Sequence, residues 1–105
     1  MSGSPTQRSL KLMRERGFHA EVVERWIPGA NIRRDLFGFG DVLCLGDEGE
    51  LVLVQSTSDS NVAARVKKIA DSPLVGRVRK AGIRIVVQGW RKVKGRWVER
   101  EVDCS

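Results

Sequence analysis

The sequence has few of the residues on which several common functional classes depend. Two cysteines, Cys44 and Cys104, are too few for a disulfide scaffold, and their spacing is unlike that of a zinc site, so we expect two free thiols. The single histidine, His19, has no nearby serine or cysteine partner, which argues against a hydrolase triad and favours a surface position. No run of about 18 apolar residues is present, so no membrane span is expected. The first residues also lack the apolar stretch of a secretory signal, and we therefore expect a cytoplasmic protein.

Positive charge is concentrated in the second half of the chain. Residues 1–60 contain seven Lys/Arg and nine Asp/Glu, whereas residues 61–100 contain twelve Lys/Arg and two Asp/Glu. A basic region of this kind is typical of proteins that bind nucleic acid, although a solubilising basic surface is the simpler alternative. Acids placed beside a basic region suggest that a bound polyanion is also chemically processed.

The length and the hydrophobic pattern predict one α/β domain over residues 1–105. Ser4, Pro5 and Gln7 are typical of a helix start, and Gly17 of its end. The expected order is αβββαβ, with a small mixed sheet flanked by helices. Strands are predicted at residues 18–26, 41–45, 50–57 and 83–87, a loop at 31–40, helices after residues 58 and 72, and a basic ribbon at 89–101 with its turn at Gly95. Because a helical crossover separates them, the strand at 83–87 should pair parallel within the same sheet.

The hairpin at residues 41–57 carries the residues that we expect to do chemistry. Asp41 begins one strand and Gln55 ends its partner, so their side chains should be neighbours, with the backbone carbonyl of Ser56 adjacent. The apolar strand turns polar at Gln55, and we expect it to leave the core there and open a site. Oxygen ligands of this type suit Mg²⁺ or Mn²⁺, and Asp35 would add charge if its loop folds back. Glu24 is a further candidate, but a solvent-facing glutamate is slightly favoured.

Several cations should surround this hairpin end. Asn61, Arg65 and Lys68 follow at a spacing of i, i+4 and i+7, which places them along one side of a helix. Arg33 and Arg34 are expected to be exposed and to contact phosphates. The ribbon would hold phosphates without reading sequence. The expected nucleic-acid contacts are Arg33, Arg34, Asn61, Arg65, Lys67, Arg91, Lys92, Lys94 and Arg96.

The aromatic and glycine residues are ambiguous. Trp26, Trp90 and Trp97 could stack on bases, but packing in the core and the ribbon is the favoured interpretation. The segment Gly38–Asp41 (GFGD) is too short for a phosphate-binding glycine loop, because no helix follows it at once. A close backbone turn that delivers Asp41 to its strand is expected instead.

Over residues 10–90 the order of elements resembles the core of the PD-(D/E)xK nuclease superfamily, which includes restriction enzymes and archaeal Holliday-junction resolvases. The family's aspartate corresponds to Asp41, and its (E/Q)xK triplet to Gln55-Ser56-Thr57. The string DLFGFGD…VQSTSDSNVAARVKKI also resembles small bacterial and phage proteins placed in this superfamily. The resemblance implies a restriction-endonuclease-like fold, a Mg²⁺ or Mn²⁺ cofactor, DNA as substrate and a homodimer.

The motif also departs from the family pattern. Thr57 occupies the position of the lysine, and a hydroxyl supplies no fixed positive charge; Lys68, or else Lys67 or Arg65, would take that role. Many members carry a glutamate in the first helix, where this chain offers only Glu15 near the helix end.

These residues predict a metal-dependent DNA endonuclease with a degenerate Q-x-T motif. Its metal ligands would be Asp41, Gln55, Ser56 and Asp35, and its catalytic residues Asp41, Gln55, Thr57 and Lys68. The alternative is a non-catalytic nucleic-acid-binding module on the same fold. A protein-interaction domain with an incidental basic face is a third hypothesis, and it predicts no steep dependence of DNA affinity on salt.

Overall fold

Helix α1 (Pro5–Glu15) begins where the sequence predicts. The Oγ of Ser4 accepts a hydrogen bond from the backbone N–H of Gln7 at 3.2 Å, and Pro5 takes the first helical position. Leu10 and Met13 are buried on the inner side of this helix. These positions come from a computed structural model that describes residues 3–105.

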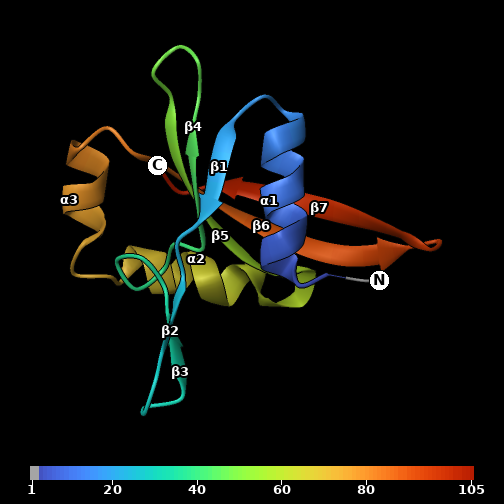
Figure 1. Ribbon diagram of the computed structural model, residues 1–105, viewed down its shortest axis with the longest axis horizontal. Coiled ribbons are helices and arrows are strands. Elements are labelled where there is room, and N and C mark those ends of the chain that lie inside the picture. Colours follow the sequence, from blue (N-terminus) through green and yellow to red (C-terminus); the bar gives the residue numbers. More distant parts are fainter. Residues whose placement is uncertain (1–2) are drawn as a thin grey trace.

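A mixed five-stranded sheet forms the centre of an α/β arrangement (Figure 1). Its order is β1-β4-β5-β6-β7, and only β5 and β6 run parallel. The crossover between those two strands passes through a 3₁₀ turn and two helices, as predicted. The bounds are β1 His19–Val22, β4 Val42–Leu45, β5 Leu51–Ser58, η1 Asp59–Asn61, α2 Val62–Ala70, α3 Val75–Lys80, β6 Arg84–Val93 and β7 Arg96–Asp103.

Helices pack against both faces of the sheet, because the central strands are apolar on both sides (Figure 1). On one face, α1 contributes Met13 to a cluster with Val42 and Val54. On the other face, α2 contributes Ile69 to a cluster with Leu53. Residues of β5 with odd numbers therefore point toward α2, and those with even numbers toward α1.

The segment from residue 18 to residue 40 differs from its prediction. It forms no single strand at 18–26 and no continuous loop at 31–40, but a separate ribbon of β2 (Arg25–Ile27) and β3 (Ile32–Arg34) that projects from the sheet (Figure 1). The ladder of β1 with β4 extends one hydrogen bond past Val22, from the backbone N–H of Val23 to the carbonyl of Asp41 at 2.9 Å, and the chain then leaves the sheet.

A tight turn leads from this ribbon to β4, as the glycine-rich segment predicts. Leu36 and Gly40 exchange two backbone hydrogen bonds of 2.8 Å, with Phe37 and Gly38 at positive φ between them. A Cβ on Gly40 would overlap the side chain of Leu53, so only glycine allows this approach. The turn places Asp41 directly before β4.

The C-terminal part forms one long hairpin. Strand β6 continues without interruption from Arg84 to Val93, where we expected a strand and a separate ribbon. Its turn lies at Lys94 and Gly95, as predicted, and both residues have positive φ. Within residues 3–105, no helix has the length and apolar character needed to cross a membrane.

Candidate metal centre

Asp41 directly precedes β4, at the end of that strand's ladder with β5. The antiparallel register pairs Val42 with Val54, and the N–H of Asp41 bonds to the carbonyl of Val54 at 2.8 Å. The side-chain Nε2 of Gln55 and the backbone N–H of Ser56 both donate to Oδ2 of Asp41 at 2.7 Å. The predicted contact between Asp41 and Gln55 is therefore confirmed. The group of Ser56 that contacts Asp41 is its N–H rather than its carbonyl.

The prediction that β5 leaves the core at Gln55 is wrong. Strand β5 continues to Ser58, and Gln55, Ser56 and Thr57 are all buried. They are buried because β6 pairs alongside them as far as Ser58 and Trp90. Strand β6 thus covers one edge of the polar end of β5, beyond the last pair of β5 with β4.

Two further carboxylates come from the base of the projecting ribbon. Glu24 precedes β2 and Asp35 follows β3, so they would form the next pair of that ladder. One carboxylate oxygen each of Glu24, Asp35 and Asp41 lies within 4.8 Å of the others. We call these three residues the acidic cluster. The slightly favoured solvent-facing position of Glu24 is wrong, since its side chain is only 15% exposed.

Two cations flank the acidic cluster. Nη1 of Arg33 is 3.5 Å from Oε1 of Glu24, and Nζ of Lys68 is 3.5 Å from Oδ2 of Asp35. Lys68 therefore reaches the acidic cluster from α2, as predicted. Arg34 and Lys68 also line a hollow of about 610 Å³ with Asp35, between the tight turn and the start of α3.

Burial and the neighbouring acids raise the pKa of the Asp41 carboxyl group. Desolvation raises the pKa of Asp41 from 3.8 to about 7, the N–H of Ser56 opposes that rise, and the carboxylates of Asp35 and Glu24 add to it. A carboxyl group with a pKa near neutrality can lose its proton to water at little cost when a cation binds the carboxylate. Perturbed groups of this kind are enriched at functional sites.

The donor set around Asp41 fits a hard divalent cation. Oε1 of the buried Gln55 has no hydrogen-bond partner among residues 3–105, although its amide touches Asp41 through Nε2. A buried acceptor without a partner costs free energy unless a ligand satisfies it. Three carboxylates and an amide oxygen are the ligands that Mg²⁺ and Mn²⁺ prefer.

Not every residue predicted for the site contacts the acidic cluster. Asn61 donates to Oγ of Ser58 at 3.0 Å, and Lys67 pairs with Asp71 at 2.7 Å. Thr57 is buried two residues after Gln55 on the same face of β5, and Arg65 is partly buried on α2. The structure therefore brings Asp41, Gln55, Asp35, Lys68 and the N–H of Ser56 together.

The remaining predicted cations lie on the hairpin of β6 and β7. Alternation places Lys92 on the α1 side of the sheet and Arg91 on the other side. Lys94 and Arg96 lie at or beside the turn. Of the three tryptophans, only Trp90 is buried as favoured, while Trp26 and Trp97 are exposed.

No family model, curated protein or solved structure matches this chain. The resemblance to PD-(D/E)xK nucleases therefore stays a prediction from the sequence.

Proposed function

We propose that this protein is a metal-dependent endonuclease of the PD-(D/E)xK type that hydrolyses DNA phosphodiester bonds on a restriction-endonuclease-like core. One observation carries the proposal: the buried Asp41 shares a cluster with the partly buried Asp35 and Glu24, and the unpartnered Oε1 of Gln55 belongs to the amide that contacts Asp41. Ion pairs that only stabilise the fold would account for the three acids, but they would not account for a buried amide oxygen without a hydrogen-bond partner.

The residues of the site would have two roles, as metal ligands and as a positively charged side chain beside the phosphate. Asp41, Asp35 and Gln55 would hold the metal, and Glu24 supplies the charge that the neutral amide lacks. A bound Mg²⁺ or Mn²⁺ would polarise the phosphodiester and lower the pKa of an attacking water. The ammonium group of Lys68, 3.5 Å from Asp35, provides positive charge where a scissile phosphate becomes more negative, which is the role that Thr57 cannot fill.

DNA would approach this site along the projecting ribbon. Strands β2 and β3 contain Arg25, Arg33 and Arg34 and no acid, and Glu24 and Asp35 stand at their base. Trp26 and Arg33 are cross-strand partners, and Arg33 reaches Glu24, so both stand on the cluster side of the ribbon. These side chains would position the duplex through its phosphates without reading sequence. A homodimer would widen this footprint.

The test is cleavage of supercoiled, nicked, branched and single-stranded DNA with Mg²⁺ or Mn²⁺. Asp41→Asn should abolish cleavage and leave or strengthen DNA binding, because a repelling carboxylate is removed. Asp47→Asn makes the same substitution at the exposed turn of the β4–β5 hairpin and should cleave as the wild type does. Activity that survives Asp41→Asn would contradict the proposal.

A non-catalytic DNA-binding module is the second candidate, and Gln55 and Thr57 favour it, because neither carries the charge that the family motif usually has. In that case the wild type binds DNA, cleaves none of these substrates, and is little changed by Asp41→Asn.

A further inference from the structure

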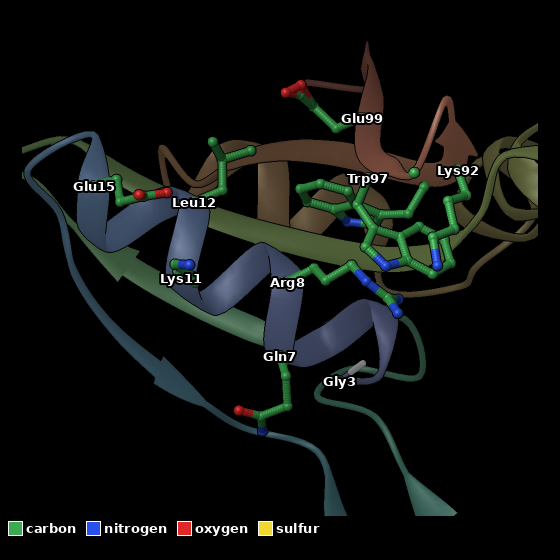
Figure 2. A pocket seen from close by; sticks show the side chains of 11 residues that line it. Gly3, Gln7, Arg8, Lys11, Leu12, Glu15, Lys92, Trp97 and Glu99 are labelled. Atoms are coloured by element: carbon green, nitrogen blue, oxygen red, sulfur yellow. The ribbon is translucent and has the colours of Figure 1, made fainter. Parts of the chain in front are cut away.

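A groove on the opposite side of the sheet is unrelated to the acidic cluster. It lies between α1 and the β6–β7 hairpin and has a volume of about 710 Å³ (Figure 2). A Cβ on Gly89 would overlap Val62 of α2, so Trp90 and Lys92 point the other way, toward α1. Gln55, by contrast, is on the α2 side. The groove is lined by Gly3, Gln7, Arg8, Lys11, Leu12, Glu15, Trp90, Lys92, Gly95, Trp97 and Glu99.

One end of the groove combines aromatic rings with cations. The guanidinium of Arg8 lies 3.5 Å from the centroid of the Trp97 ring, and Nζ of Lys92 lies 5.8 Å from it. Figure 2 shows Arg8, Trp97 and Lys92 gathered at this end, with Glu15 at the other. Beneath them, Nε1 of Trp90 donates to Oγ of Ser9 at 3.0 Å, which fixes the floor to α1.

The cations of the groove are not paired with its carboxylates among the residues that the structure describes. Arg8, Lys11 and Lys92 form no ion pair with any residue between 3 and 105, although Glu15 and Glu99 line the same groove. Nε of Arg8 is buried and has no hydrogen-bond partner within that range. Trp97 nevertheless remains 39% exposed. An unneutralised guanidinium stacked on an exposed indole is suited to a ligand that is both planar and anionic.

We propose that this groove binds an unpaired nucleotide of a single-stranded nucleic acid. The base would stack on the Trp97–Arg8 pair, and its phosphates would meet Lys92 and Lys11. Unpaired bases stack on aromatic rings and on arginine planes, and such stacking contributes about 1–3 kcal/mol per base. A paired base cannot enter because its faces are already stacked. This binding needs no cleavage at the acidic cluster, and it would hold a displaced strand away from that site.

Fluorescence anisotropy with a labelled thymidine oligonucleotide and a matched duplex, in low salt with EDTA, tests the proposal. Trp97→Ala should weaken binding of the single strand about tenfold, and Trp97→Phe should retain most of it, because the stacking surface remains. Lys92→Glu should weaken binding more than Lys80→Glu, which makes the same charge change on the exposed, distant side of α3. The duplex should respond far less to Trp97→Ala than the single strand does.

Three outcomes would overturn this proposal. They are wild-type affinity of Trp97→Ala for the single strand, equal losses in Lys92→Glu and Lys80→Glu, and displacement of the oligonucleotide by poly-glutamate of equal charge, which would assign the groove to an acidic peptide. Asp41→Asn separates this proposal from the proposed nuclease, because it should keep the affinity for the single strand whether or not the wild type cleaves DNA. Thermal melting of each variant confirms that the hairpin is intact.

Discussion

The amide of Gln55 donates to Oδ2 of Asp41 at 2.7 Å and leaves its own oxygen without a partner inside the protein, among the residues that the structure describes. The contact joins two neighbouring strands at a point where both side chains are buried. Two carboxylates from the projecting ribbon, those of Glu24 and Asp35, lie next to it. The amide oxygen and the three carboxylates are the ligands of the cation site proposed above, and that proposal has consequences that can be measured.

Asp41→Asn should stabilise the metal-free protein more at high pH than at low pH. The pKa of Asp41 is raised from 3.8 to about 7, so the folded state holds a proton that the unfolded state loses between those values. The free energy of unfolding of the wild type therefore falls as pH rises through that window, and asparagine removes the effect. The gain should be roughly 2–3 kcal/mol larger at pH 8 than at pH 5. Urea unfolding in EDTA measures it, and an equal gain at both pH values would contradict the raised pKa.

Gln55→Glu should make stability depend strongly on metal. It adds a fourth carboxylate to the acidic cluster and removes the hydrogen bond to Asp41, so the melting temperature in EDTA should fall. Mn²⁺ should recover that loss, because the new charge strengthens its binding. Gln88→Glu is the matched control, since Gln88 is equally buried and also has an unpartnered Oε1, but lies on the α1 side. If Mn²⁺ stabilises both variants alike, the cluster is not a specific site.

Lys68→Ala should remove most of the cleavage activity while leaving metal binding intact. Its ammonium pairs with Asp35, whereas that of the neighbouring Lys67 pairs with Asp71. Loss of a charge that acts in the transition state typically costs about 10²–10³ in kcat. The loss should be at least tenfold smaller for Lys67→Ala in the same plasmid assay. An equal loss of cleavage activity in the two variants would show that the lysines of α2 contribute only general positive charge.

Gly40→Ala should destabilise the protein by about 1–3 kcal/mol, because the new methyl group overlaps the buried side chain of Leu53. Leu53→Ala removes the side-chain atoms that this methyl group would overlap. A double-mutant cycle in urea should therefore give a double variant that is more stable than the sum of the two single changes predicts. Additive losses would mean that the turn adjusts without contacting Leu53.

The hairpin and its pairing were predictable because they depend on local pattern. The polar turn at residues 46–49 and the apolar strands on either side define one register. That register ends with Val42 opposite Val54, so the neighbouring Asp41 and Gln55 come into contact. The parallel partner of β5 followed from the helical crossover. The burial of Gln55 and Thr57 was not predictable in this way, because it depends on how far β6 extends alongside.

The third acid, Glu24, was named as a candidate but ranked below a solvent-facing position, for a different reason. Alternation through residues 18–26 assumes an unbroken strand, but the chain leaves the sheet after Val23, and the pairing of β2 with β3 places Glu24 beside Asp35. The ribbon at residues 25–34 is short and largely exposed, so it has no hydrophobic pattern to reveal it. The sequence signal was the turn pair Pro28-Gly29 between two short runs rich in β-forming residues.

The groove on the α1 side could not be read from sequence. Ser9 and Trp90 are 81 residues apart in the sequence, and they are in contact because α1 packs over β6 in the folded chain. Trp97 was expected to pack, yet it is 39% exposed with Arg8 upon it. Patterns within single elements do not report such contacts between distant ones.

The most direct test of the acidic cluster is calorimetric titration of Mn²⁺ into the wild type, Asp41→Asn and Asp47→Asn in low salt, with a short non-cleavable DNA duplex present so that its phosphates are available. Mn²⁺ should bind saturably to the wild type and to Asp47→Asn, and this binding should be lost in Asp41→Asn. Equal heats for all three proteins would contradict a metal centre at Asp41.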